Sequence, residues 1–278
     1  MTPFSIVVRG RVVEYRRPAV MGILNITDDS FYDGGRYRDA DAMLRQAHRM
    51  VDEGADIIDV GASSSRPGAT LLSPDEEARR LAEAVRLLRT ELPEMVISVD
   101  TCYSLPARVA VEAGADIIND IGGGTLDDAM FRTIAELQVP YVLMHTRGTP
   151  ADMQRHTGYD DIVDDLARYF SSRLDDLYRL GVKDVWLDPG FGFAKTTGEN
   201  QELLHRLDEL TSLFREPLLV GMSRKSMVYK PLGITPQEAL CGTIVLDTMA
   251  LERGARILRV HDVREAVETV MLTHLETI

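Results

Sequence analysis

The sequence predicts an α/β fold: a single (β/α)8 barrel of the TIM type, with an N-terminal β-hairpin that closes its bottom. Eight short runs rich in Ile, Val and Leu alternate with helical stretches at intervals of roughly 25–40 residues, which is typical of parallel strands joined by helical crossovers. Each of the eight runs ends in a polar, chemically capable residue. Because active sites of such barrels lie at the C-terminal ends of the strands, these endings predict a catalytic mouth.

The eight runs are recognised by their apolar centres and by the polar residues that close them. In chain order they are VMGILNIT, ADIIDVG, VISVDT, ADIIND, YVLMHT, DVWLDPG, LLVGMSRK and RILRVHD. Their endings carry Asn25, Asp59, Asp100, Asn119, His145, Asp188, Ser223-Arg224-Lys225, and Arg259 with His261. An open doubly wound sheet is the competing architecture. We favour a closed ring because no Gly-x-Gly-x-x-Gly follows the first run and polar residues end all eight.

Local signals define the hairpin and the helix ends. Residues 4–15 alternate around Gly10, which predicts a hairpin ahead of the first barrel strand. Ser73, followed by Pro74 and two acids, is typical of a helix N-terminus. Helices are expected to end at Gly54, Gly114, Gly181 and Gly254. No linker or change of composition divides the chain, so residues 1–278 are expected to form one domain.

Composition narrows the class of protein. The chain has 278 residues, of which 45% are hydrophobic and 27% charged, so it can bury a sizeable core. A net charge of −13 argues against nucleic acid and anionic membranes as partners, although a small anionic substrate remains compatible with a local cationic cleft. Two cysteines, no signal peptide and no apolar stretch of roughly 20 residues predict a soluble protein of the reducing cytoplasm.

Two connections at the predicted mouth are longer than a minimal barrel needs. Residues 27–38 combine acids, aromatics and a glycine pair, and residues 62–73 combine hydroxyl groups with Arg66 and a Pro-Gly pair. Mobile loops at this position can close over a substrate and exclude water, and we favour that interpretation. Solvated turn chemistry is the alternative, since Gly, Ser and Asp support turns in any protein.

Carboxylates and an amide end three of the middle runs. A buried carboxylate survives only if donors satisfy it, and Asp100, Asn119 and Asp188 together suit the N–H edge of a flat heterocycle such as a 2-aminopyrimidinone. The alternative is that these side chains cap the barrel layers or bond neighbouring strands. His145, which ends the fifth run, is as plausibly a structural hydrogen-bonding group as a catalyst.

Cations end the last two runs. Arg259 and His261 are two residues apart, so strand alternation turns both toward the mouth. The loops after strands seven and eight are the habitual phosphate position of this fold, and an arginine fork suits a phosphoryl group. Pairing of Arg224 or Arg259 with a surface acid is the alternative. Asn25 is suited to orienting an anion or binding a hard cation such as Mg²⁺, although spacing alone is weak evidence for a metal.

These residues lie in segments that resemble the dihydropteroate synthases, and the resemblance runs through essentially the whole chain. MGILNITDDSFYDGG and DVGASSSRPGA resemble the first two family signatures, followed in the family's order by ISVDT, AGADIINDIGGG, MHTRGTPADMQ, LDPGFGFAKTTGENQELL, GMSRKS and ILRVHDV. The resemblance implies a (β/α)8 barrel, usually homodimeric. It also implies condensation of 6-hydroxymethyl-7,8-dihydropterin diphosphate with 4-aminobenzoate, which yields 7,8-dihydropteroate and pyrophosphate for folate synthesis.

The resemblance also implies roles for individual residues. For the pterin these are Asp100, Asn119, Asp188, Lys225, Arg259, Ile121, Met144 and Phe193. For the diphosphate they are Asn25, Arg66, Arg259 and His261, with Mg²⁺ at Asn25. For 4-aminobenzoate, where sulfonamides would compete, they are Ser65, Arg66, Pro67, Phe193, Lys225 and Ser226. The residues expected to carry the catalysis are Asp100, Lys225, Arg259 and Asn25.

The mechanism implied by the resemblance is dissociative. Pyrophosphate leaves first, the electron-rich pterin stabilises the exocyclic cation, and the aryl amine then adds. Such a route needs fixed charges near the developing cation more than it needs a general base. A homodimer is expected through residues 235–255, where small and apolar residues allow close helix packing.

Three positions depart from the family pattern. Asp28 stands where proline is usual, Ser63 replaces a glutamate, and Ser65 replaces a commoner threonine. The departures at Asp28 and Ser63 are the only support for a pterin-binding paralogue that lacks synthase activity. A barrel of the methyltetrahydrofolate methyltransferase type is a third hypothesis, but the SRKS and RVH elements fit a diphosphate substrate better.

Overall fold

Eight parallel strands form the wall of a barrel in the computed structural model, which describes residues 3–26, 36–63 and 72–274. The strands are β3 (Ala19–Asn25), β4 (Ile57–Gly61), β5 (Val96–Asp100), β6 (Ile117–Asp120), β7 (Tyr141–Met144), β8 (Val185–Asp188), β9 (Leu219–Val220) and β10 (Ile257–Val260). Their order is β8-β7-β6-β5-β4-β3-β10-β9. An isolated parallel bridge between Leu187 and Leu218 links the two edge strands, so the ring closes. The predicted (β/α)8 fold is confirmed.

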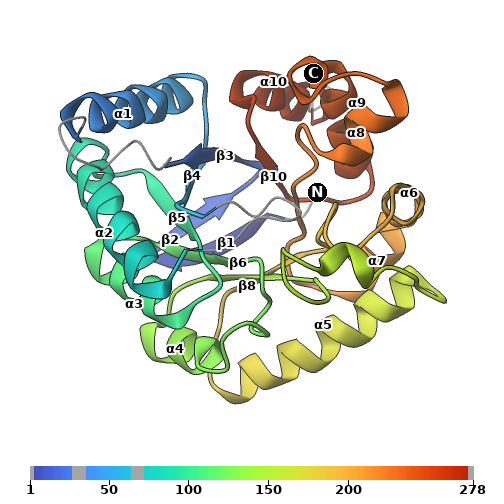
Figure 1. Ribbon diagram of the computed structural model, residues 1–278, viewed down its shortest axis with the longest axis horizontal. Helices are drawn as coiled ribbons and strands as arrows, with labels where there is room; N and C mark the ends of the chain where they lie inside the picture. Colours follow the sequence, from blue (N-terminus) through green and yellow to red (C-terminus); the bar gives the residue numbers. More distant parts are fainter. Residues whose placement is uncertain (1–2, 27–35, 64–71, 275–278) are drawn as a thin grey trace.

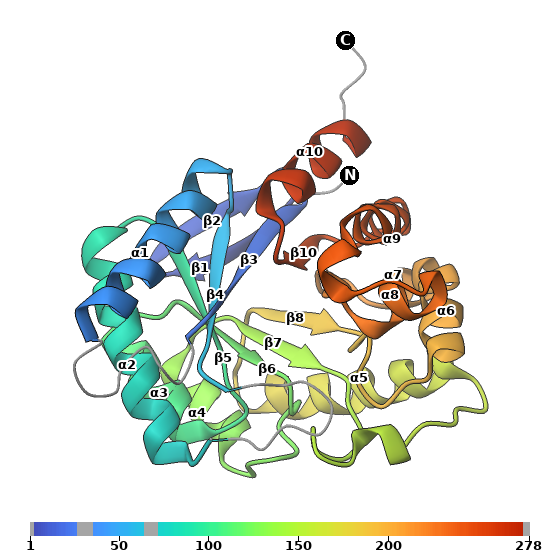
Figure 2. The same ribbon diagram turned by 45° about the horizontal axis from the view of Figure 1, so that its top comes forward.

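Helices surround the strands (Figures 1 and 2). They are α1 (Arg36–Asp52), α2 (Pro74–Glu91), α3 (Ser104–Ala113), α4 (Met130–Leu137), α5 (Ile162–Arg179), α6 (Thr197–His205), α7 (Leu207–Leu213), α8 (Ser226–Leu232), α9 (Leu240–Glu252) and α10 (Val263–Thr273). Two 3₁₀ turns, Met153–Arg155 and Pro236–Glu238, lie in the connections. In the part of the chain that the structure describes, no helix combines the length and the apolar character that crossing a membrane requires.

The helix boundaries follow the local signals in the sequence. Ser73 is the N-cap of α2, and its hydroxyl accepts a hydrogen bond from the Glu76 amide at 3.4 Å. Pro74 and three acids occupy the first turn, where their charge opposes the helix dipole. Gly114 ends α3 in the left-handed conformation, with φ of 114°, which a glycine adopts without steric cost.

The N-terminal hairpin closes the lower end of the barrel, as predicted. Strands β1 (Phe4–Val8) and β2 (Arg11–Tyr15) pair antiparallel across a two-residue turn. The Phe4 ring stacks on Tyr15 at a centroid distance of 4.8 Å and meets the edge of Trp186 at 5.9 Å. The hairpin therefore seals the lower end with aromatic and aliphatic side chains, which are packed against the first residues of the barrel strands.

The interior of the barrel changes from apolar to polar along the strand direction. The lower inward positions form one apolar cluster with the hairpin: Met21, Ile57, Val96, Ile117, Val142, Trp186, Leu219 and Ile257. Two residues further along each strand, the same face carries Ile23, Asp59, Ser98, Asn119, Met144, Asp188, Gly221 and Arg259. The strand period of two therefore places a polar layer directly above a packed apolar one, at the C-terminal ends of the strands.

Candidate active site

An arginine lies at the centre of the polar layer. The Nε of Arg259 on β10 donates to Asp59 Oδ2 at 2.7 Å, and one terminal nitrogen donates to Asp100 Oδ2 at 2.6 Å. The Arg259 side chain is only 14% exposed. A buried guanidinium needs such charge-assisted partners, so the two carboxylates fix its plane beside the hollow.

Asp59 also fixes the orientation of a neighbouring amide. Its carboxylate accepts from Ser98 Oγ at 2.6 Å and from Asn119 Nδ2 at 3.0 Å. Because the NH₂ of Asn119 is committed to Asp59, the Oδ1 of Asn119 remains as a buried acceptor, and it has no partner among the described residues. Such an acceptor carries a desolvation cost until a ligand N–H reaches it.

Asp100 ends β5 beside this arginine. Burial raises the pKa of Asp100 to about 7, although the positive charge of Arg259 opposes the rise. The two carboxylates Asp59 and Asp100 share one guanidinium, and their mutual repulsion adds to the effect of burial. Asp100 therefore changes charge near neutral pH instead of remaining ionised far below it.

A second cation, Lys225, lies near Asp188. Lys225 Nζ donates to the Phe191 carbonyl at 2.7 Å and lies 4.6 Å from the centroid of the Phe193 ring. Burial lowers the pKa of Lys225 to about 8, while Asp188 and Asp100 oppose that fall. Burial likewise raises the pKa of Asp188, against the pull of Lys225.

Acidic and basic side chains meet at the C-terminal end of the barrel. A Cβ placed on Gly221 would lie 3.7 Å from Arg259 Cβ and 3.8 Å from Lys225 Nζ, so both cations flank the end of β9. Asp188 lies near enough to both cations for each to lower its pKa. The structure thus brings together the carboxylate, amide and cationic side chains that the sequence placed on six different strands.

An apolar cluster lies next to these polar groups. Ile121, Met144 and Phe193 belong to a single cluster, and each is less than a tenth exposed. Phe193 lies against Lys225, so this cluster provides an apolar, partly aromatic surface beside the hydrogen-bonding groups. A flat ring with polar atoms on its rim requires such a combination.

At the ends of β9 and β10, His261 and Arg224 take different partners. His261 donates its backbone N–H to Ser223 Oγ at 3.2 Å, and its ring Nδ1 lies 3.1 Å from the same oxygen. Burial, followed by the charge of Arg259, lowers the pKa of His261 to about 4, so the imidazole is neutral at pH 7. Arg224 is held by Asp262 through two contacts of 2.6 and 2.9 Å. For Arg224 the ion-pair alternative is therefore the one observed.

Asn25 lies at the rim, and its side chain is exposed. A Cβ on Gly61 would lie 3.4 Å from Asn25 Oδ1 and 3.8 Å from Asp100 Oδ2, which places two hard oxygens near one point. Ser226 is the first residue of α8 and is half-buried beside Lys225. Residues Ser65, Arg66, Pro67 and Asp28 lie outside the described residues.

Comparisons with known proteins agree with this geometry. The profile of the family described as "Pterin binding enzyme" matches residues 21–261. The dihydropteroate synthase of Synechocystis sp. is 44% identical, with 89% of this chain and 86% of the relative covered. That of Escherichia coli is 41% identical, with 94% and 93% covered. The chain belongs to the pterin binding enzymes, among the dihydropteroate synthases.

Solved structures of the same family share the fold closely. The Yersinia pestis dihydropteroate synthase with a sulfonamide drug complex matches with a TM-score of 0.89 and 39% identity, covering 97% of this chain and 98% of that one. The Xanthomonas albilineans dihydropteroate synthase with 4-aminobenzoic acid matches with a TM-score of 0.88 and 36% identity, covering 98% and 97%. Both are likenesses along nearly the whole chain of this pterin binding enzyme.

Sequence reasoning overlooked two residues of this pterin binding enzyme's site. Asp59 was noted only as a strand ending, but it is the third residue of β4, fully buried, and holds both Arg259 and Asn119. Its signal was an acid inside an otherwise apolar run, which has no packing reason to be there. Lys195 was not singled out, although it directly follows a glycine-rich turn and is 3% exposed.

One departure from the family pattern can be placed. Ser63 lies at the start of the second long connection, where its hydroxyl accepts from the Leu72 amide at 3.4 Å. The serine thus spans the two described ends of that connection, which is a structural use of the hydroxyl. This contact gives no support to the inactive-paralogue hypothesis.

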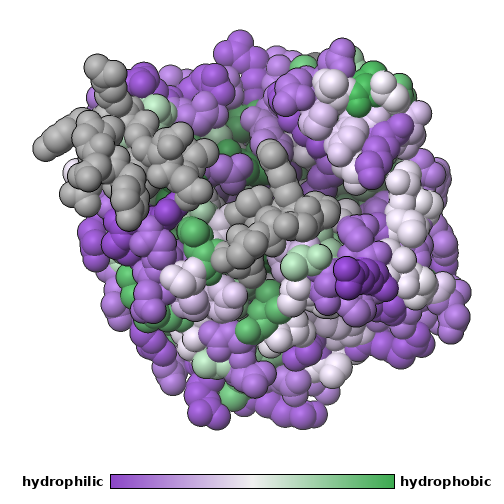
Figure 3. Space-filling model, in the orientation of Figure 1, coloured by the Kyte–Doolittle hydropathy of each residue, from purple (hydrophilic) through white to green (hydrophobic). Residues whose placement is uncertain are grey.

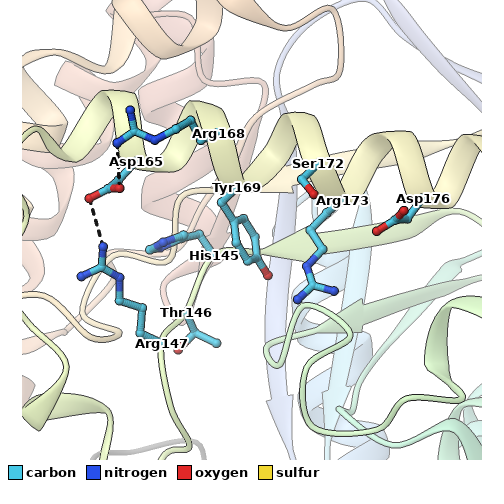
Figure 4. A pocket seen from close by; sticks show the side chains of 9 residues that line it. All are labelled: His145, Thr146, Arg147, Asp165, Arg168, Tyr169, Ser172, Arg173 and Asp176. Atoms are coloured by element: carbon cyan, nitrogen blue, oxygen red, sulfur yellow. Dashed lines mark hydrogen bonds and ion pairs between the residues drawn. The ribbon is translucent and has the colours of Figure 1, made fainter.

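A second hollow lies outside the barrel, against α5 (Figure 4). It has a volume of about 590 Å³ and is lined by His145, Thr146, Arg147, Asp165, Arg168, Tyr169, Ser172, Arg173 and Asp176. Asp165 binds both Arg147 and Arg168, at 3.0 and 2.9 Å, so two of its arginines are already paired. It contains none of the residues grouped around Arg259, and we assign it no part in the chemistry.

Proposed function

We propose that the chain condenses 6-hydroxymethyl-7,8-dihydropterin diphosphate with 4-aminobenzoate, releasing 7,8-dihydropteroate and pyrophosphate. The observation that supports this most directly is the buried Oδ1 of Asn119, which has no partner in the part of the chain that the structure describes, because a pterin edge presents adjacent N–H groups. Membership among the dihydropteroate synthases supplies the reaction, and the site supplies complementary groups for a pterin.

The pterin is proposed to lie over the polar layer. Asn119 Oδ1 accepts one ring N–H, and the carboxylates of Asp188 and Asp100 accept others. Lys225 donates to a ring acceptor, and the planar guanidinium of Arg259 lies against the ring face. Ile121, Met144 and Phe193 complete the enclosure, so that water is excluded from the hydrogen-bonding edge.

The other two subsites are proposed to lie at the rim. Asn25, His261 and Arg259 hold the diphosphate, with Arg66 joining them from the second long connection. Ser226, Lys225 and Phe193 border the 4-aminobenzoate position. Ser65 and Pro67 complete that subsite in this proposal.

The site is suited to Mg²⁺ at Asn25, because an amide oxygen and the neighbouring Asp100 carboxylate are hard donors and Mg²⁺ accepts few protein ligands. When bound, the metal supplies charge neutralisation for the leaving pyrophosphate. Titration of the apoprotein with Mg²⁺ and Mn²⁺, followed by Mn²⁺ paramagnetic broadening in wild type and Asn25→Ala, tests this assignment. Equal broadening in both proteins would exclude Asn25.

A dissociative course fits the charges of the site. The C–O bond between the pterin methylene and the diphosphate breaks, and pyrophosphate carries away the electron pair. Asp100 and Asp188 are fixed near the methylene cation that develops, so their charges stabilise it without reorganisation. The amine nitrogen of 4-aminobenzoate then forms the new C–N bond and loses its proton.

Pyrophosphate release measured with both substrates tests the proposal. An active synthase releases pyrophosphate only when pterin diphosphate, 4-aminobenzoate and the metal are present together, and Lys225→Ala or Asp188→Ala nearly abolishes the release. A protein that binds the pterin but makes no dihydropteroate would be the inactive paralogue. Methyl transfer from methyltetrahydrofolate would instead indicate the methyltransferase type.

Two further assignments belong to this proposal. A homodimer is proposed through α9, on which Val245 is 57% exposed, and through the end of α8, where Leu232 is 58% exposed. Figure 3 shows a small apolar patch among pale and hydrophilic side chains in the region where Figure 1 places α9. A cytoplasmic location is proposed from the two cysteines, Cys102 and Cys241, which are both free.

A further inference from the structure

Lys195 is a buried lysine, and within the ranges that the structure describes it has no carboxylate partner. It follows the turn after β8, is 3% exposed, and has no acidic group within ion-pair distance among the described residues. Burial lowers the pKa of Lys195 to about 7, while Asp188 opposes that fall. Burying an ammonium group costs free energy of desolvation, so the hydrogen bonds of Lys195 have to offset that cost.

Three acceptors surround its ammonium group. Lys195 Nζ lies 3.1 Å from the Gly190 carbonyl, 3.1 Å from the Phe193 carbonyl and 3.0 Å from His145 Nδ1. An ammonium has three N–H donors, and each one therefore has a partner here. When Lys195 is protonated, this contact requires a lone pair on Nδ1, so His145 is then neutral with its proton on Nε2. Burial and the charge of Lys195 hold the pKa of His145 well below its usual value, in agreement with a neutral imidazole.

The two carbonyls belong to a turn that carries much of the site. Gly190 and Gly192 both have positive φ, of 69° and 83°, and the carbonyls of Gly190 and Phe193 accept from Lys195. The Gly190 amide donates to Asp188 Oδ1 at 2.7 Å. The Phe191 carbonyl holds Lys225, and the Phe193 ring lies under the Lys225 ammonium.

The imidazole is itself held firmly. Its ring meets the edge of Tyr169 at a centroid distance of 4.9 Å, and Figure 4 shows it beside Tyr169 at the bottom of the outer hollow. The backbone carbonyl of His145 would lie 2.0 Å from a Cβ on Gly190, so only glycine allows the turn to pack this closely against the end of β7. The acceptor for Lys195 is thus mounted on the barrel wall.

We propose that Lys195, acting through His145, is a positioning residue for the reaction: its ammonium ties the Gly190–Phe193 turn to the end of β7 and thereby places Phe193, Asp188 and the anchor of Lys225. Lys195 touches neither substrate in this proposal. It rests on the proposed function only for the kinetic readout, because the turn itself is observed in the structure.

The test compares variants that keep or remove the hydrogen bonds. Lys195→Met removes all three donors at similar length, and His145→Leu removes the ring acceptor. His145→Asn keeps an oxygen near the position of Nδ1, and exposed Lys183→Met is the matched lysine control. Steady-state kinetics of purified full-length proteins, together with hydrogen exchange of the 189–195 peptide, are the measurements.

We expect Lys195→Met and His145→Leu to raise the KM for 4-aminobenzoate by about tenfold or more, with a smaller fall in kcat, because a misplaced wall weakens binding before it affects the chemistry. Exchange in the 189–195 peptide should rise about tenfold in both variants. The double variant should be no worse than the worse single one, since both lose the same contact. His145→Asn should show a smaller rise, and Lys183→Met none.

Several outcomes overturn the proposal. They are unchanged KM values in a folded Lys195→Met, additive effects in the double variant, and equal defects in His145→Asn and His145→Leu. If Lys195→Met does not fold, the two His145 variants decide the question. A wild-type protein that makes no product refutes the proposed function, whereas peptide exchange and calorimetry with the pterin diphosphate still test the turn.

Discussion

Asp59 fixes the orientation of two other side chains of the site, although its own carboxylate is fully buried. It holds Arg259 at 2.7 Å and the amide of Asn119 at 3.0 Å, so it determines which face of a guanidinium and which atom of an amide the ligand meets. Removing one carboxylate of a buried ion pair leaves the remaining charge less compensated. Replacement of Asp59 should therefore weaken folding as well as binding.

Asp59→Asn tests this role. An asparagine can donate as well as accept, so the Asn119 amide loses its fixed orientation and Arg259 loses one of its two carboxylates. We expect the dissociation constant for the pterin diphosphate to rise roughly 30-fold, equivalent to about 2 kcal/mol. Calorimetric titration measures it. Asp184→Asn, the same change at the lower end of the barrel, is the control, and equal binding in wild type and Asp59→Asn would contradict the assignment.

Two buried side chains of the site, Asp100 and Lys225, determine the expected pH dependence of kcat/KM. The pKa of Asp100 is raised to about 7, so the ionised form that stabilises a cation is lost as pH falls through that value. The pKa of Lys225 is lowered to about 8, so its charge is lost as pH rises through that value. We expect a bell-shaped profile with limbs near these values.

Stability shows the opposite sign for the acid. Because the folded pKa of Asp100 is raised above its unfolded value, ionisation of this group lowers the free energy of unfolding as pH rises toward 7.

Lys225→Arg is the control for the kinetic profile. An arginine stays charged, so the alkaline limb of kcat/KM should move to higher pH. A kcat/KM that stays roughly constant between about pH 6 and 9 would exclude both assignments.

Elements divide the work between stability and chemistry. The lower apolar layer and the hairpin β1–β2 form one cluster, in which Ile6 is 1% exposed. The polar layer lies two residues further along the strands, above this packed floor. The hairpin therefore supports the site from below without contacting a substrate.

Ile6→Ala should destabilise the fold and spare the chemistry. Removing a fully buried isoleucine side chain leaves a cavity and costs about 2–4 kcal/mol in the free energy of unfolding. Urea denaturation measures the loss. KM values at a temperature where the variant is folded should stay within about twofold of wild type. Val12→Ala, at a position 71% exposed on the same hairpin, is the control, and a large KM change in Ile6→Ala would place the hairpin in the site.

At the scale of the whole molecule, the barrel leaves apolar side chains on the outer face of α8 and α9. A dimer through this face should give a mass of about twice the 31.0 kDa of one chain by light scattering. Val245→Glu buries a charge in that interface and should yield monomers, whereas Val12→Glu on the hairpin should not. A monomeric wild type would remove this proposal.

The sequence by itself determined the strands, their order, the hairpin, the α2 cap and the chemical type of nearly every strand ending, because period, capping and turn chemistry are local. Only the tertiary structure decided which partners those endings take. Arg259 meets Asp59 across 200 residues of sequence, Arg224 is diverted to Asp262, and Lys195 finds His145. Closure of the barrel brings strand ends that are distant in sequence within hydrogen-bonding reach. A local sequence pattern does not predict which of these ends become neighbours.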